Sequence, residues 1–316
     1  MKIVFLDEAT IPLNDDIDFS VFQELGDYVG YPHCTEEEII QRAAAVEVVI
    51  PNKVRMTPRV IESLDSLQLI AEIATGYDNV DLQAARENNV TVCNVAGYAA
   101  NTVPQHTFAL ILNLATKAHI YHADVMAGEW AKASSFNLLN YPAFELKDLT
   151  IGIIGFGTIG RGVARIAEGF GMRVLAYDIV GIQNSHYPNT DLETIFRQSD
   201  FVTVHSPLTD QTRNLIDADA LSKMKPTAMV INTARGGIVD EEALAAALNS
   251  GQIAGAGFDV LTSEPPVEGN VLLTAKNVIM TPHCAWSTRE ARQKLVNETA
   301  ENIRAFVEGR PRNIVV

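Results

Sequence analysis

Six residues near the middle of the chain, Gly155–Gly160 with the sequence GFGTIG, have the spacing of a phosphate-binding turn. They follow the apolar run LTIGIIG and precede the helix-like run RGVARIAEGFG. The first glycine permits a tight turn, the second lets the backbone approach a pyrophosphate, and the third lets the helix pack closely on the strand. The helix N-terminus adds unpaired N–H groups and the positive end of its dipole.

The next apolar run, RVLAYD, ends at Asp178, where an acid can accept hydrogen bonds from ribose hydroxyls. Strand, glycines, helix, strand and acid together predict a dinucleotide site; a glycine-rich turn in an ordinary βαβ unit is the alternative. Ile179, Val180 and Gly181 follow, with no Arg or Lys to receive a 2′-phosphate. We therefore expect NAD rather than NADP.

Three further polar residues lie at or near the ends of predicted strands: Arg235 in NTARGG, Glu264 in DVLTSEPP and His283 in MTPHCAW. Taken singly, they would be a surface charge, a turn residue and a core histidine. The carboxyl ends of parallel strands gather at one edge of a sheet, which is where ligands bind. Three such groups beside a dinucleotide site therefore favour catalysis.

Alternating strand and helix patterns surround these residues and predict an α/β fold with parallel sheets. Thr35 with Glu38, and Thr57 with Pro58, mark helix starts. We expect long helices at 101–128 and 288–309. The predicted strands are 2–7, 46–51, 67–75 and 90–95 in the first part, and 149–155, 173–178, 201–206, 229–234, 253–260 and 278–283 in the second.

The bulk composition excludes several classes of protein. A chain of 316 residues suggests two domains. The formal charge of −15 opposes binding to nucleic acid or anionic membranes. The most apolar run, FALILNLA, contains Asn113 and is too short to span a bilayer. The N-terminus does not resemble a signal peptide.

Cysteine and histidine spacing predicts neither disulfides nor a metal site. Cys34, Cys93 and Cys284 are odd in number and widely separated, which is typical of reduced thiols in a cytoplasmic protein. His119 and His122 lie three residues apart but lack acids or cysteines at a matching spacing. We expect no metal.

Nearly the whole chain resembles the D-isomer-specific 2-hydroxyacid dehydrogenases. The resemblance implies two doubly wound parallel-sheet domains: a Rossmann NAD-binding domain, residues 99–285, inserted into a discontinuous flavodoxin-like substrate domain, residues 1–98 and 286–316. It rests on several blocks in the family's order: GFGTIGRGVARIAEGFGMRVLAYD, HSPLTDQTRNLI, MKPTAMVINTARGGIVDEEAL, GAGFDVLTSEPP and TPHCAWST.

The resemblance also implies roles for individual residues. Arg235 would bind the substrate carboxylate, His283 would be the acid-base, and Glu264 would hold its imidazole and favour the protonated form. The cofactor contacts would be Gly155, Phe156, Gly157, Thr158, Ile159, Gly160 and Asp178, then His205, Ser206, Pro207 and Thr212 on the adenosine and phosphate side, and Thr233, Ala234, Asp259 and Ala285 near the nicotinamide. Pro207 as a strand terminator and Thr212 as a helix cap are compatible alternatives.

The substrate wall is expected in the first part of the chain. Thr75, Gly76 and Tyr77 follow a predicted strand and could present N–H groups to a carboxylate, although the same turn could simply lead into a helix capped by Asp81. Lys53 ends another strand and could add positive charge or be merely solvated. Trp286 would line the pocket or be a buried core residue.

Within the family, the blocks look most like the glycerate dehydrogenase/hydroxypyruvate reductase branch. The small 2-keto acid would then be hydroxypyruvate or glyoxylate, with D-lactate or another D-2-hydroxy acid as alternatives. Pro104, Cys284 and the stretch 99–101 depart from the usual pattern. A non-catalytic NAD-sensing interaction protein is the alternative of another class. The family also implies a homodimer through the cofactor domain, with 101–128 contributing.

Overall fold

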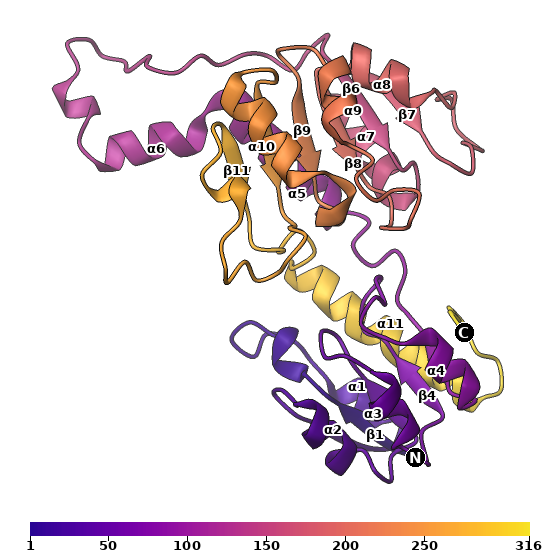
Figure 1. Cartoon of the computed structure of the whole chain (residues 1–316). Coiled ribbons are helices and arrows are strands. Elements are labelled where there is room, and N and C mark those ends of the chain that lie inside the picture. Colours follow the sequence, from indigo (N-terminus) through magenta and orange to yellow (C-terminus); the bar gives the residue numbers. More distant parts are fainter. The chain divides into compact units, whose positions relative to one another are not determined.

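The computed structural model describes all residues from 1 to 316 and divides them into two compact units. The first unit comprises Met1–Ala99 and Ser287–Val316, and the second comprises Ala100–Trp286. Each junction lies one residue beyond the boundary expected from the sequence. The first unit is therefore built from both ends of the chain (Figure 1).

The sheet of the first unit is parallel throughout, with the strand order β2-β1-β3-β4-β5. This is the flavodoxin-like order, in which the chain changes its direction of travel between β1 and β3. Polar residues that follow β1, β3 and β4 thus gather at one edge. The strands are β1 (Lys2–Phe5), β2 (Asp27–Gly30), β3 (Val48–Ile50), β4 (Leu69–Ala71) and β5 (Thr91–Cys93).

Helices cover this sheet and are started by the expected caps. Thr35 and Glu38 form a capping box, and the Thr57 side chain accepts a hydrogen bond from the Val60 amide, with Pro58 in the first turn. The last helix joins this unit, where Arg292 donates two hydrogen bonds to Asp16, 2.6 and 2.7 Å long. The helices are α1 (Ser20–Gln23), α2 (Glu36–Arg42), α3 (Pro58–Glu62), α4 (Leu82–Glu87) and α11 (Arg289–Val307).

The second unit contains a six-stranded parallel sheet in the order β11-β10-β9-β8-β6-β7. The chain moves from β6 outward to β7 and then crosses to β8, so the switch point lies between β6 and β8. The GFGTIG turn follows β6 at this point. The strands are β6 (Thr150–Ile154), β7 (Arg173–Tyr177), β8 (Phe201–Val204), β9 (Met229–Asn232), β10 (Gly255–Phe258) and β11 (Val278–Met280).

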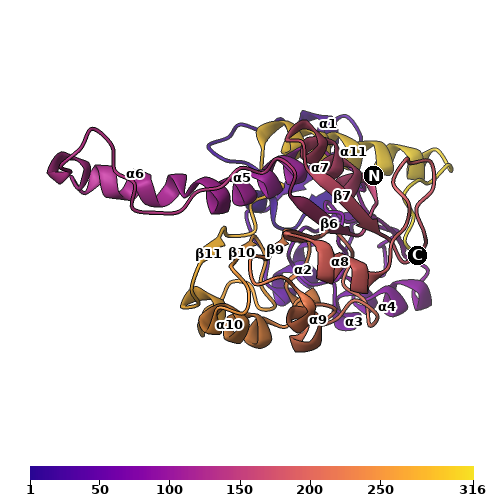
Figure 2. The same cartoon turned by 90° about the horizontal axis from the view of Figure 1, so that it is seen from above.

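Two helical layers enclose that sheet (Figure 2). On one face α5 and α7 bury residues such as Phe108 and Val163; on the other, α8, α9 and α10 bury residues such as Ile195, Leu221 and Leu244. The expected doubly wound parallel folds are confirmed. These helices are α5 (Thr102–Thr116), α7 (Thr158–Gly169), α8 (Leu192–Gln198), α9 (Ala218–Lys223) and α10 (Glu241–Ser250).

The prediction of a single helix over 101–128 is wrong. The helix ends at Thr116, Lys117 adopts a left-handed conformation with φ 57°, and α6 (Ala118–Met126) begins after it. The two helices differ in burial, because α5 packs on the sheet and on α7 whereas α6 has no buried residue. In Figures 1 and 2, α6 extends away from the sheet of its unit.

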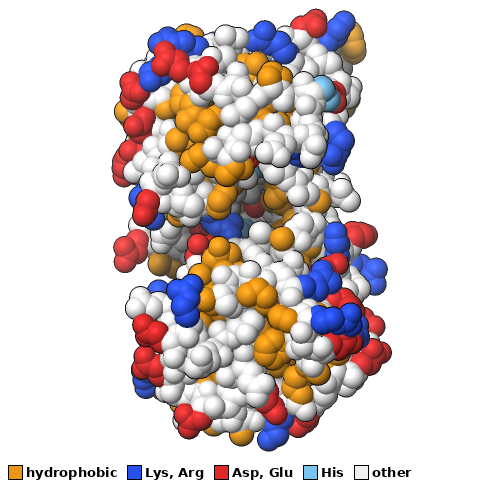
Figure 3. Space-filling model, turned by 90° about the vertical axis from the view of Figure 1, so that its right-hand side faces the viewer, with side chains coloured by type: hydrophobic (Ala, Val, Ile, Leu, Met, Phe, Trp, Pro, Cys, Tyr) orange, Lys and Arg blue, Asp and Glu red, His pale blue; other side chains and the backbone are white.

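The surface is mixed in charge. On the face drawn in Figure 3, Lys and Arg side chains lie among Asp and Glu side chains rather than forming a continuous basic surface. None of the helices has the length and apolar character needed to cross a bilayer.

Candidate functional site

The glycine turn after β6 packs so closely that two of its glycines have no room for a side chain. Gly155 has φ +91°, and a Cβ there would lie 2.6 Å from the backbone of His205. A Cβ on Gly160 would lie 2.2 Å from the carbonyl oxygen of Gly155. Both glycines are therefore needed for the close packing of β6, α7 and the loop after β8.

Gly157 differs from these two because a Cβ there would meet no atom within 4 Å. Its φ of −73° is also open to any residue. This glycine is the N-cap of α7 and has no side chain to cap the first N–H groups of that helix. The turn fits a dinucleotide pyrophosphate.

Asp178 is fixed by backbone N–H groups at the end of β7. Its Oδ2 accepts from the Phe156 amide at 2.8 Å, and its Oδ1 accepts from the Val180 amide at 3.1 Å. The carboxylate is thus held beside the glycine turn. The following side chains, Ile179 and Val180, are exposed and apolar.

The loop after β8 carries four expected cofactor contacts. His205 Nε2 bonds Thr203 Oγ1 at 2.9 Å, whereas its Nδ1 is buried without a partner. Burial lowers the pKa of His205 to about 3, so the ring is neutral. Thr212 donates to the Pro207 carbonyl at 2.7 Å and fixes the turn that holds Ser206 and Pro207.

His283 and Glu264 are in direct contact. His283 Nδ1 lies 2.5 Å from Glu264 Oε2, and the Leu261 amide donates to Glu264 Oε1 at 2.6 Å. Burial alone would raise the pKa of Glu264, but the hydrogen bonds from His283 and Leu261 and the positive charge of Arg235 hold that pKa below its ordinary value. Glu264 is therefore ionised at neutral pH and fixes His283 Nδ1 as the donor, which leaves Nε2 out of this hydrogen bond.

The backbone of His283 is unusual, with φ 52°. Its amide donates to the Asp259 carbonyl at 2.7 Å, and the Trp286 indole donates to the His283 carbonyl at 3.0 Å. Left-handed residues other than glycine persist where surrounding contacts hold them. These bonds orient the imidazole.

Asp259 is buried between the ends of β10 and β11 and accepts several hydrogen bonds there. Its Oδ1 accepts from Thr281 Oγ1 at 2.5 Å and from the Cys284 amide at 2.9 Å, and its Oδ2 accepts from the Ala285 amide at 2.8 Å. These bonds fix two of the residues expected near the nicotinamide, Asp259 and Ala285.

Thr233, Ala234 and Arg235 follow β9 in the same unit. Thr233 Oγ1 lies 3.1 Å from Thr107 Oγ1 of α5. Asn232 binds both sides of this turn, accepting from the Ala234 amide at 3.0 Å and donating to the Arg235 carbonyl at 2.8 Å. Arg235 Nη1 donates to the Ala234 carbonyl at 2.8 Å. The turn thus presents a guanidinium close enough to act on the Glu264 carboxylate.

The first unit carries the other candidates. Lys53 follows β3, and its amide donates to buried Asp7 Oδ2 at 2.6 Å, while its side chain is exposed. After β4, Thr75 donates to the Val95 carbonyl at 2.8 Å, and the Tyr77 side chain is exposed. Gly76 lies between them. The structure thus places all four at the carboxyl edge of the first sheet.

Two comparisons show the family of the chain. A family model described as the D-isomer specific 2-hydroxyacid dehydrogenase NAD binding domain matches residues 108–285. The glycerate dehydrogenase of Methylorubrum extorquens is 43% identical, over 99% of this chain and 98% of that protein. The chain belongs to the D-isomer-specific 2-hydroxyacid dehydrogenases. The resemblance expected from the sequence blocks is confirmed, and the dehydrogenase is an oxidoreductase of 2-hydroxy acids with an NAD-binding domain.

Other relatives agree with this assignment. The hydroxypyruvate reductase of Blautia hydrogenotrophica is 34% identical, over 100% of this dehydrogenase and 99% of that protein. The structure of an NADPH-dependent glyoxylate/hydroxypyruvate reductase from Sinorhizobium meliloti has a TM-score of 0.87 and 26% identity, covering 100% of this chain and 97% of that one.

Sequence reasoning missed two supporting residues of this dehydrogenase. His106 of α5 lies 2.9 Å from Thr281 Oγ1, which in turn donates to Asp259. Glu241, the first residue of α10, accepts from the Thr262 amide at 2.7 Å and from Asn270 Nδ2 at 2.6 Å. These bonds hold the loop that carries Glu264 on both sides of that residue. No residue spacing in the sequence marked either of them.

Proposed function

We propose that the dehydrogenase transfers a hydride between NAD(H) and a small 2-keto or 2-hydroxy acid, with His283 as the acid-base. The observation that carries this is the 2.5 Å bond between His283 Nδ1 and ionised Glu264, in the unit that matches the NAD-binding family model. The second unit is accordingly the cofactor domain and the first the substrate domain. When bound, the nicotinamide supplies or accepts the hydride.

In the reductive direction His283 Nε2 donates a proton to the substrate oxygen as the carbonyl carbon is reduced. The Glu264 carboxylate stabilises the imidazolium before that step and holds the ring afterwards. In the oxidative direction neutral Nε2 takes the hydroxyl proton back. A histidine suits both directions because its charge changes near neutral pH.

Arg235 is proposed to bind the substrate carboxylate and polarise the reacting carbonyl, since its planar guanidinium offers two parallel donors. Backbone N–H groups of 75–77 and the Lys53 ammonium are proposed as substrate contacts of the first unit, and Trp286 as a substrate contact of the second. A local cation is needed because the net charge of −15 opposes an anionic substrate.

The preferred substrate is proposed to be hydroxypyruvate, with D-glycerate as the product, or glyoxylate. The names of the relatives support this, since they include a glycerate dehydrogenase and a hydroxypyruvate reductase. D-lactate and other D-2-hydroxy acids are the alternatives within the same chemistry.

The cofactor is proposed to be NAD rather than NADP. This is supported by the hydrogen bond that holds Asp178 beside the glycine turn and by the apolar Ile179 and Val180 that follow it. A related structure is of an NADPH-dependent enzyme, so the preference is measured directly. The ratio of kcat/KM for NADH to that for NADPH should exceed one by a wide margin; a ratio below one contradicts the role given to Asp178.

The reaction is tested with a panel of keto acids, by following NADH consumption with the wild type and with His283→Ala. Hydroxypyruvate or glyoxylate should give the highest kcat/KM, and His283→Ala should lower it by about 10²-fold or more. Equal activity of the two proteins with every acid contradicts the role of His283. A higher kcat/KM with pyruvate favours D-lactate.

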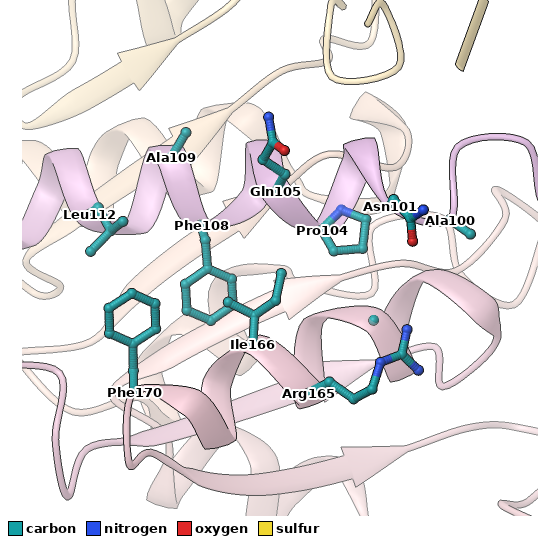
Figure 4. Close-up of a pocket in the computed structure, with 11 residues that line it drawn as sticks. Ala100, Asn101, Pro104, Gln105, Phe108, Ala109, Leu112, Arg165, Ile166 and Phe170 are labelled. Carbon is teal, nitrogen blue, oxygen red and sulfur yellow. The ribbon is translucent and has the colours of Figure 1, made fainter. Parts of the chain in front are cut away.

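A homodimer is proposed as the assembly, through the second unit. A groove of about 640 Å³ lies between α5 and α7, lined by apolar residues that include Phe108, Leu112, Ile166 and Phe170 (Figure 4). The same unit exposes Met126, Trp130, Phe136 and Leu139 on α6 and the loop after it. A second copy of the chain offers an apolar surface of this kind to such a groove.

A cytoplasmic location is also proposed. It is supported by three cysteines that form no disulfide, two of which are buried. Fractionation of the source cells tests it: activity confined to the extracellular or periplasmic fraction contradicts it.

A further inference from the structure

We propose that His106, Asp259 and Cys284 form a site for a divalent transition-metal ion of the zinc type. One ligand atom from each side chain lies within 4.8 Å of the others. The three residues come from α5, from the position just after β10 and from the loop after β11, so folding rather than sequence spacing assembles them. All three belong to the second unit.

The set of donor atoms selects the class of ion. An imidazole nitrogen, a thiolate and a carboxylate oxygen are all ligands of Zn²⁺, and a thiolate does not suit Mg²⁺ or Ca²⁺. His106 Nε2 and Asp259 Oδ1 are 3.5 Å apart. That separation matches two ligand atoms each about 2.0–2.1 Å from one tetrahedral ion.

The surroundings support the ligands. Both Asp259 oxygens accept backbone N–H bonds, from Cys284 and Ala285, as ligating carboxylates usually do. His106 and Cys284 are partly exposed, which gives an ion a route of entry. Binding releases the Cys284 thiol proton, and the ion would replace the hydrogen bonds that Thr281 Oγ1 makes with His106 Nε2 and Asp259 Oδ1. A water molecule can complete a four-coordinate site.

An ion at this site would compete with the cofactor. Asp259 and Ala285 are proposed nicotinamide contacts, and the ion takes up the carboxylate. The consequence is inhibition by zinc that NADH relieves. The competition rests on the proposed function, whereas binding of zinc to the cofactor-free protein does not.

The experiment measures Zn²⁺ binding by titration calorimetry on chelator-treated, cofactor-free protein, with the unfolding midpoint as a second readout. The variant is Cys284→Val, and the control is Cys93→Val, a substitution at a buried thiol of the first unit. The wild type and the control should bind one ion per chain and melt at a higher temperature with zinc. Cys284→Val should bind it at least roughly tenfold more weakly.

His106→Gln provides a second, independent variant, since its amide can still bond Thr281, and it should also weaken binding by about tenfold or more. Equal zinc affinity of the wild type and both variants overturns the proposal, as does absence of binding by the wild type. If zinc binds as expected but does not raise the apparent KM for NADH, the site stands and the role given to Asp259 in cofactor binding fails.

Discussion

Glu72 is a buried acid whose protonation is coupled to the stability of the fold. It follows β4, is completely buried, and accepts a bond from Asn79 Nδ2 at 3.0 Å, while its Oε1 has no partner. Burial raises its pKa well above 4.5; Asn79 and Lys53 oppose the shift, and Asp7 and Asp78 add to it. Between pH 4.5 and that raised pKa, the folded protein therefore holds a proton that the unfolded chain releases.

We therefore predict that Glu72→Gln raises the free energy of unfolding by an amount that depends on pH. Wild-type stability should fall as the pH rises above 4.5, the ordinary pKa of Glu72, towards its raised folded value. Glutamine stays neutral, so the variant should have the larger free energy of unfolding at neutral pH, by about 1.4 kcal/mol for each unit of pKa shift. The gain should vanish in acid.

Urea unfolding of both proteins across pH 4.5 and above measures this difference. Glu62→Gln, on the exposed end of α3, is the control and should leave the pH profile unchanged. A variant less stable than the wild type at neutral pH but not in acid would contradict the raised pKa of Glu72.

At the scale of elements, two glycines of the turn between β6 and α7 are predicted to differ in role: one in NADH binding and the other in packing. A methyl group on Gly157 meets no protein atom, whereas one on Gly160 meets the Gly155 carbonyl at 2.2 Å. Gly157→Ala should therefore lower the free energy of unfolding only by the cost of a poorer N-cap, about 1 kcal/mol or less, while weakening NADH binding. Gly160→Ala should cost about 1–3 kcal/mol.

Chemical unfolding and fluorescence titration with NADH measure the two effects. Normal NADH affinity in Gly157→Ala would contradict the placement of the pyrophosphate. Equal stability of the two variants would contradict the packing of α7 on β6.

We predict that the start of α10 positions the loop that carries Glu264. Glu241→Gln removes the acceptor that binds Asn270 and weakens the one that binds Thr262, two residues before Glu264. A hydrogen bond to a charged group contributes about 1.5–3 kcal/mol, so kcat/KM should fall by about tenfold. Since the contact between Glu264 and His283 loosens, the pH profile of kcat/KM should move as well.

Glu242→Gln is the matched control, because the neighbouring side chain is exposed, and it should behave as the wild type. A fall in stability with an unchanged pH profile and kcat/KM would assign Glu241 a structural role only.

A helix, strand or turn could be predicted from the sequence where a short stretch of residues determines it. The glycine turn, the Thr35 and Thr57 caps and the buried strands were predicted because short segments determine them. The break at Lys117 has no Gly or Pro to mark it and depends on α6 leaving the sheet. β2 (Asp27–Gly30) was missed because DYVG is short, polar at one end and only partly buried at this sheet edge.

The same reasoning applies to the site. Arg235, Glu264 and His283 stand out by residue type at the ends of strands, and their roles stay predictions. The contacts of His106 and Glu241 form only when folding places α5 and α10 beside loops that are far away in the sequence. No local pattern records such a contact.

At the scale of the whole molecule, the unpartnered surfaces of the second unit predict the assembly. Ala109 is exposed on α5 and lines the groove that Figure 4 shows beside α7. Ala109→Arg places a charge in an apolar groove without disturbing a buried residue. It should therefore leave the fold intact and shift a dimer towards monomers, because a buried unpaired charge is costly.

Sedimentation velocity of the wild type and of Ala109→Arg measures the shift, with circular dichroism to verify the fold. Ala218→Arg, at the exposed start of α9, is the control and should sediment as the wild type. The groove and the exposed aromatic residues Trp130 and Phe136 lie on one unit. In a symmetric dimer, the aromatic residues of each copy can therefore cover the groove of the other. A wild type that sediments as a monomer at micromolar concentration contradicts the homodimer, and a dimeric Ala109→Arg moves the interface away from the groove.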